Sequence, residues 1–119
     1  MHELSFIKNI LGVALRYARE TSASKIKTIY LRLGILRDLQ EEWVQRYFVY
    51  ISKGTIAEDA EIIIMIEPVV CSCNVCSERF GVDMKEFTDD DELLCPNCKA
   101  HDYELVSGME FVIQGIEVE

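Results

Sequence analysis

The sequence predicts an α+β fold, in which two helices pack on a small three-stranded sheet and a four-cysteine module is inserted between two strands of that sheet. Apolar residues recur at helical spacing in two segments and alternate at strand spacing in two others, which indicates a mixed fold. All five cysteines lie within residues 71–98, which indicates a separate module there. A strand-like segment follows this module, and we expect it to return to the first sheet.

The first helix is expected over residues 4–20, where a wide apolar face suits packing on a sheet. Its apolar stripe comprises Leu4, Ile7, Leu11, Ala14, Leu15 and Ala18, and Phe6, Ile10, Val13 and Tyr17 widen it. The second helix is expected over residues 40–53, and Gly54 stands where a helix stop belongs. Trp43, Tyr47, Tyr50 and Ile51 lie on one face of this helix, with Val44 and Phe48 beside them.

Three further segments are expected to be strands. Residues 26–36 alternate, with Ile29, Leu31, Leu33 and Ile35 on the face expected to be buried. Residues 62–66 form a continuous apolar, β-branched run, which favours a central strand, and Pro68 ends it. Residues 109–118 also alternate, but Ile116 and Val118 are out of phase with Met109, Phe111 and Ile113. A bulge near Gln114 and Gly115 would restore the register.

The charge balance limits the function classes. The chain has 12 Lys+Arg and 21 Asp+Glu, a formal net charge of −9, which argues against a protein that binds duplex nucleic acid. No apolar run approaches the roughly 20 residues of a membrane span. The start of the chain lacks the pattern of a secretion signal, so we expect a cytoplasmic protein.

Four cysteines form two closely spaced pairs. Cys73 and Cys76 are separated by two residues, as are Cys95 and Cys98, and 18 residues separate the pairs. This spacing is typical of tetrahedral Zn²⁺, because each tight turn directs two thiolates at one metal and the gap admits a hairpin. We therefore predict a structural zinc site.

Other interpretations of the cysteines remain open. Four sulfurs in a tetrahedron also suit iron. A single pair can act as a dithiol, but this requires a thiol of lowered pKa, usually at a helix N-terminus, and two pairs among strands and turns disfavour it. Cys71 is left over; it could replace Cys73 only with a looser spacing, and we interpret it as a free thiol with a structural role.

The remaining polar residues do not indicate catalysis. The acidic run at residues 89–92 lacks the spacing of a calcium loop and is interpreted as a solvated loop tip. His2 and His101 are the only histidines, so histidine acid–base chemistry is scarcely available. We expect a protein that is not an enzyme.

The N-terminus offers a second group of metal ligands. A histidine at position 2 is most often an exposed terminal residue. However, the α-amine of Met1, the backbone and imidazole nitrogens of His2 and the amide nitrogen of Glu3 can surround one ion in a plane, which suits Ni²⁺ or Cu²⁺ better than Zn²⁺. The Glu3 carboxylate could add an axial oxygen. Amide nitrogens bind only when deprotonated, so this site should release its ion as pH falls, which suits carriage.

With these features together, the sequence resembles the HypA/HybF family of hydrogenase nickel-incorporation proteins over nearly its whole length. The resemblance includes the start Met1-His2-Glu3-Leu4-Ser5, the pair Leu33-Gly34, the segment Gly54-Thr55-Ile56-Ala57-Glu58, the two cysteine pairs, and the closing residues 108–119. The start combined with the two cysteine pairs is highly specific.

The resemblance implies a nickel metallochaperone. It implies Ni²⁺ bound at Met1, His2 and Glu3 as cargo, and structural Zn²⁺ on the four paired cysteines. It also implies a nickel-binding α+β domain over residues 1–68 plus 108–119, with a zinc-ribbon domain inserted at residues 69–107. The implied partners are the GTPase HypB and the large subunit of [NiFe]-hydrogenase, with the urease machinery in some organisms.

The sequence supports two rival functions less well. A nucleic-acid-binding or regulatory zinc ribbon would have equally suitable cysteine spacing, but the chain lacks a basic face studded with aromatic residues. A thiol–disulfide oxidoreductase would have to turn over a disulfide substrate with zinc bound, which we do not expect.

Overall fold

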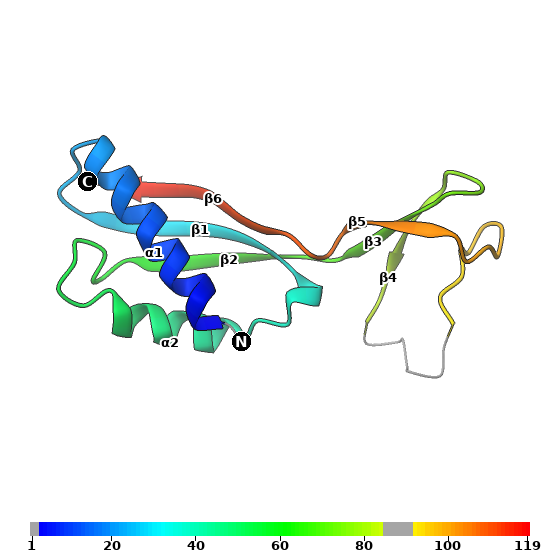
Figure 1. Cartoon of the computed structure of the whole chain (residues 1–119), viewed down its shortest axis with the longest axis horizontal. Helices are drawn as coiled ribbons and strands as arrows, with labels where there is room; N and C mark the ends of the chain where they lie inside the picture. The colour runs from blue at the N-terminus through cyan, green and yellow to red at the C-terminus, as the bar shows by residue number, and fades with distance from the viewer. Residues whose placement is uncertain (1–2, 85–91) are drawn as a thin grey trace. The chain divides into compact units, whose positions relative to one another are not determined.

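The computed structural model describes residues 3–84 and 92–119 (Figure 1). The elements follow the order α1 (Glu3–Glu20), β1 (Ile26–Gly34), the 3-10 turn η1 (Ile35–Arg37), α2 (Glu41–Ile51), β2 (Glu61–Glu67), β3 (Val69–Cys73), β4 (Arg79–Val82), β5 (Tyr103–Ser107) and β6 (Phe111–Val118). Of the described helices, neither has the length and apolar character needed to cross a membrane. The acidic run expected at a loop tip lies outside the described residues except for Glu92.

The chain divides into two compact units. The first unit comprises the chain up to Arg32, together with Leu39–Met65 and Phe111–Glu119. The second unit comprises Leu33–Asp38 and Ile66–Glu110.

The sheet of the first unit has the strand order β2-β1-β6, so the last strand does return to the first sheet. β1 and β2 run in the same direction with α2 in the connection between them, whereas β6 runs in the opposite direction (Figure 1). α1 contacts both α2 and β6. Apolar residues of both helices and of two strands are fully buried: Ile7, Ile10, Ala14, Ala18, Ile26, Ile29, Leu31, Val44, Phe48 and Ile62. The predicted α+β class is confirmed.

The helices bury somewhat different faces from those that the sequence indicates. In α1, Leu4 at the start of the predicted stripe is 41% exposed, whereas Ile10, one of the residues expected to widen the stripe, is fully buried. In α2, the core side chains are Val44 and Phe48, whereas Trp43 is 42% exposed. Trp43 and Tyr50 therefore lie on the outer side of the helix, whereas Phe48 faces the core.

The strands differ from prediction in two places. β2 is at an edge of the sheet and β1 is central, so the expectation of a central strand at residues 62–66 is wrong. A β-branched run indicates a strand but not its neighbours, and Ile63 and Met65 are both partly exposed. β1 also ends earlier than expected, because Ile35 begins the 3-10 turn η1 and is exposed.

The predicted change of phase in the last strand is present. In β6 the half-buried Phe111 and Ile113 alternate with exposed residues, and then Gly115 and Ile116 are both half-buried. The second helix ends at Ile51, two residues before the expected end, with Ser52 as its C-cap. Gly54 lies in the turn that follows and has a φ of 80°, a left-handed conformation that glycine adopts without strain.

The second unit contains an antiparallel sheet in the order β4-β3-β5. Cys71 on the central strand lies opposite Phe80 of β4 and Leu105 of β5. Only Pro68 separates β3 from β2, so the chain enters this sheet directly from the first.

Two glycines in the second unit allow two backbone segments to meet closely. The Gly34 N–H donates to the Glu110 carbonyl at 2.8 Å, and the Leu36 N–H donates to the Gly108 carbonyl at 2.8 Å. A Cβ added to Gly34 would lie 2.0 Å from the carbonyl carbon of Gly108. Gly108 itself has a φ of 123°. The contact therefore requires glycine at both positions.

We predict that Gly34→Ala lowers the free energy of unfolding of the second unit by about 3 kcal/mol, because backbone atoms must move apart to admit the methyl group. Gly12→Ala is the matched control, since no atom lies within 4 Å of the added Cβ on α1. It should raise stability by about 0.5–1 kcal/mol. Urea unfolding measures the free energy of unfolding of both variants. A Gly34→Ala variant that is as stable as Gly12→Ala would contradict the prediction.

Tyr30 and Glu117 join β1 to β6 on the surface of the first unit. The Tyr30 hydroxyl donates a hydrogen bond to the Glu117 carboxylate, and this bond, with some desolvation, raises the pKa of Tyr30 above its usual value. Since the folded state holds the phenol proton more tightly, the contribution to stability is complete below about pH 10, the unfolded pKa, and is lost as pH rises through the folded pKa.

We therefore expect Tyr30→Phe to be less stable than the natural chain at neutral pH. The difference between the two urea midpoints should shrink as the pH rises beyond about 10. A difference that stays constant through that range would show that the hydrogen bond has no effect on stability.

Candidate metal centre

The first cysteine pair occupies a tight turn that begins at the end of β3. The Ser77 N–H donates to the Cys73 carbonyl at 3.0 Å, and the Cys73 N–H donates to the Glu78 carbonyl at 2.9 Å. The Val75 N–H also donates to the Cys73 sulfur at 3.4 Å. Ser77 has a φ of 65°, so the chain turns through the left-handed region directly after Cys76.

The second pair repeats this turn. The Lys99 N–H donates to the Cys95 carbonyl at 2.9 Å, and the Cys95 N–H donates to the Ala100 carbonyl at 2.9 Å. Lys99 has a φ of 64°, matching Ser77 in the first turn. Two turns of the same geometry therefore present two sulfurs each.

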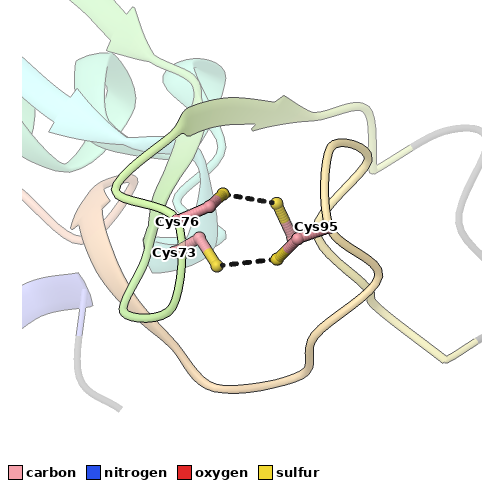
Figure 2. Close-up of side chains that lie close together, drawn as sticks. Cys73, Cys76 and Cys95 are labelled. Carbon is pink, nitrogen blue, oxygen red and sulfur yellow. Dashed lines mark hydrogen bonds between the residues drawn. The ribbon is translucent and has the colours of Figure 1, made fainter.

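The four sulfurs converge on one point. All four ligand atoms lie within 4.8 Å of one another. The Cys73 and Cys98 sulfurs are 3.5 Å apart, and the Cys76 and Cys95 sulfurs are 3.6 Å apart. Figure 2 shows the side chains of Cys73, Cys76 and Cys95 pointing toward one another. Metal–sulfur bonds of about 2.3 Å in a tetrahedron give sulfur–sulfur distances of about 3.8 Å, so the cluster has the size of a four-thiolate metal site.

The sulfurs differ in how readily they lose a proton. A hydrogen bond from the Asn97 side chain, with further help from the backbone at Glu78, lowers the pKa of Cys76 to about 6. The Ala100 backbone has the largest influence on Cys98 and lowers its pKa, yet desolvation and the neighbouring cysteines together raise it to about 12. One thiolate thus forms easily and a further one only with difficulty, unless a cation balances the charge.

The centre rests on a small core. Cys73 and Cys95 are 2% and 0% exposed, and they pack in a cluster with Val69, Cys71 and Phe80. Cys71 is also buried, and burial raises its pKa. It lies two positions before Cys73 on the same face of β3 and belongs to this core, not to the four-sulfur cluster.

A pair of hydrogen bonds fixes the first turn from outside. The Asn74 N–H donates to the Asp102 carbonyl and the Asn74 side chain donates to the Asp102 carboxylate, both at 2.9 Å. His101 directly precedes Asp102 in the chain. Its Nδ1 lies 3.8 Å from a carboxylate oxygen of Glu92, and both side chains are well exposed. The roles of Asn74 and Asn97 could not be predicted from the sequence, since an asparagine between two cysteines gives no signal by itself.

Of the three residues predicted to bind nickel, Met1 and His2 lie outside the described residues, and Glu3 begins α1. The first turns of α1 are held in place, because the ring of Phe6 stacks on that of Phe111 with 4.7 Å between ring centres. The predicted nickel ligands therefore adjoin a helix that is anchored to β6.

The left-handed residues after each pair suggest a direct test. We expect Lys99→Gly to retain the stability of the metal centre and Lys99→Val to lower it by about 1–2 kcal/mol, because a β-branched side chain is strained at this φ. The rate of metal loss to a chelator measures the effect. Equal loss from the two variants would contradict the expected role of the turn.

The whole chain is similar to known proteins. A family model described as hydrogenase/urease nickel incorporation, metallochaperone, hypA matches residues 1–118. The hydrogenase maturation factor HypA of Pyrococcus abyssi is 36% identical, with 100% of this chain and 96% of the relative covered. That of Prosthecochloris aestuarii is 34% identical, with both chains covered completely.

Two solution structures share the fold at 20% sequence identity. One, of a HypA protein, has a TM-score of 0.74 and covers 100% of this chain and 97% of its own. The other, of the Ni metallochaperone HypA from Helicobacter pylori, has a TM-score of 0.66 and covers 99% and 97%.

Proposed function

Because the chain belongs to the HypA family of hydrogenase and urease nickel-incorporation metallochaperones, we propose that it binds Ni²⁺ at its N-terminus and delivers this ion during the maturation of [NiFe]-hydrogenase. The observation that carries the proposal is the family match over residues 1–118 in a chain that begins Met1-His2-Glu3. Urease is a second client that the family description allows.

Nitrogen ligands at the N-terminus would hold the nickel. The Met1 amine, the His2 backbone and imidazole nitrogens and the Glu3 amide nitrogen would form a planar site, with the Glu3 carboxylate in reach of an axial position. Such a site would release its nickel as pH falls, because two amide nitrogens must lose protons to bind the ion. The anchored start of α1 supports this proposal, since it gives the short chelating segment a fixed base.

Zn²⁺ is the proposed resident of the four-cysteine centre. The sulfur–sulfur distances of 3.5 and 3.6 Å and the two matching turns support a tetrahedral ion. Zinc prefers this donor set and has no redox chemistry of its own, which suits a structural role. In this proposal, residues 1–68 plus 108–119 form the nickel-binding domain and residues 69–107 form the zinc ribbon.

The chemistry of this function is ligand exchange and not catalysis. The proposed partners are the GTPase HypB, which we expect to contact the α1 end near His2, and the hydrogenase large subunit that receives the ion. We place the protein in the cytoplasm. Family membership and the net charge of −9 do not favour the rival nucleic-acid-binding zinc ribbon.

The proposal predicts that untagged protein binds about one equivalent of Ni²⁺ and develops the yellow colour and diamagnetism of a planar four-nitrogen complex. His2→Ala, or a residue added before Met1, should abolish nickel binding and leave the zinc content unchanged. Metal analysis with and without added nickel measures both ions. Nickel retained by either variant, or absent from the natural chain, would overturn the N-terminal site.

Cys95→Ala is the complementary variant in the same experiment. It should lose zinc and unfold the second unit locally, because a segment with so small a core depends on its metal. Nickel binding at the N-terminus should persist. Full zinc content in this variant would contradict the zinc assignment.

A further inference from the structure

One edge of the sheet in the first unit is available for pairing with another chain. In the order β2-β1-β6, β2 has β1 on one side, and no strand of the described residues pairs with its other side. Figure 1 shows β2 and β6 at opposite margins of this sheet. Alternate residues of an edge strand direct their N–H and carbonyl groups away from the sheet, where an extended chain can bind them.

β2 has few of the features with which proteins protect such edges. All five residues between Glu61 and Glu67 are apolar, so neither a proline nor a charge interrupts the strand. The other edge strand, β6, is interrupted: its phase changes around Gly115, and it carries the polar residues Gln114 and Glu117. β2 is therefore the edge of this sheet that is better suited to receive another strand.

A shallow hollow on α2 adjoins this edge. It is lined by Glu41, Glu42, Gln45, Arg46 and Val49. The Gln45 side chain reaches β2 and donates a hydrogen bond to the Ile62 carbonyl, so this carbonyl already accepts from a group outside the sheet. Ile64 lies two positions further along and directs its own N–H and carbonyl to the same side of the strand as Ile62.

We propose that β2 and this hollow form a docking site for an extended segment of another protein, which adds a strand beside β2 and has an apolar centre with basic ends. Main-chain hydrogen bonds provide the affinity of such pairing, and alternate side chains provide the specificity. Ile63 and Met65 lie on one face of β2 and are 37% and 42% exposed, and Val49 in the hollow is 55% exposed. Apolar side chains of the added strand cover these three residues.

The charges around the site determine the ends of the segment. Glu41, Glu42 and Glu61 are all exposed. Arg46 is the basic residue of the hollow, and its guanidinium lies 5.1 Å from the centre of the Trp43 ring. Carboxylates therefore outnumber basic groups here, and lysine or arginine in the bound segment complements them.

A second copy of β2 is a poor occupant of the same site. Antiparallel pairing of two copies about Ile64 would place Glu61 of each copy opposite Glu67 of the other. Like charges directly opposite each other weaken a strand pair, and the net charge of −9 on each chain adds to the repulsion. A segment with basic ends meets attraction where a second copy meets repulsion.

A short synthetic peptide is a suitable probe, in which alternating valine and threonine are flanked by a lysine at each end and both termini are capped. A flexible peptide loses much of its gain in ordering, so we expect a dissociation constant on the order of 1 mM. NMR titration of the full chain, with zinc and without nickel, at up to about 5 mM peptide should shift signals of β2 and of the residues lining the hollow.

Hydrogen exchange in the same samples tests the strand pairing itself. The peptide should slow amide exchange at Ile64, whose N–H points away from β1. It should leave exchange at Ile63 and Met65 unchanged, because the N–H groups of these residues point toward β1. Binding through side chains alone would not produce this alternation.

Two control peptides separate the backbone contribution from that of charge. A peptide of the same sequence with every backbone nitrogen methylated keeps its lysines but cannot donate main-chain hydrogen bonds, so it should not bind. A peptide with glutamate in place of both lysines should bind at least about tenfold more weakly.

A matched pair of variants tests the charges of the protein. Glu42→Lys should weaken binding of the lysine peptide at least about fivefold. Glu104→Lys on β5 makes the same change in net charge at an exposed position of the second unit and should have little effect. Circular dichroism should show the natural fold in both variants, since both glutamates are exposed.

Binding that slows exchange at Ile64 and requires both the peptide N–H groups and its lysines is the expected result. A peptide that leaves β2 unchanged, equal binding of the methylated peptide, or protection on β6 in place of β2 would each overturn the proposal. Slower exchange at Ile64 on raising the protein concentration without peptide would identify a second copy as the occupant and also overturn it. None of these measurements requires nickel, so their outcome does not depend on the proposed function.

Discussion

The close approach of four sulfur atoms is the constraint on which the second unit depends. The sheet β4-β3-β5 is short, and its core consists of a few residues around Cys71 and Phe80. The ends of two turns must meet within 4.8 Å although 18 residues separate them in the chain. Four negatively charged thiolates at these distances would repel one another, and a bound cation would offset that repulsion. With the proposed metal bound, the folding of this unit and the binding of the metal would be coupled.

The first unit differs from the second because apolar packing stabilises it. β1 is central, and residues from α1, α2 and β2 complete the core around it. The stacking of Phe6 on Phe111 ties the first turns of α1 to β6. The proposed nickel-binding segment of three residues would need no cavity, because the helix that follows it is held in this way. In the proposed function, the two metal sites would differ in the chemistry of their ligands, with nitrogen for nickel and sulfur for zinc.

The exposed aromatic residues of α2 show where pattern and packing diverge. Periodicity groups Trp43, Tyr47 and Tyr50 as one face, but the core takes the neighbouring face with Val44 and Phe48. Several large side chains on the outer side of a helix carry a cost in exposed apolar area unless they serve binding. A departure of this kind from the simplest packing is expected at functional surfaces, where local and global requirements differ.

Sequence by itself determined the α+β class, the extents of both helices to within a few residues, the return of the last strand to the first sheet and the grouping of the four cysteines. These features depend on local periodicity and on the fixed geometry of short turns. Tertiary structure alone decided that β2 lies at an edge, which face of α2 is buried, that Cys71 belongs to the core and that Gly34 meets Gly108. Each of these features depends on which segments distant in the chain become neighbours, and the local sequence pattern does not predict those neighbours.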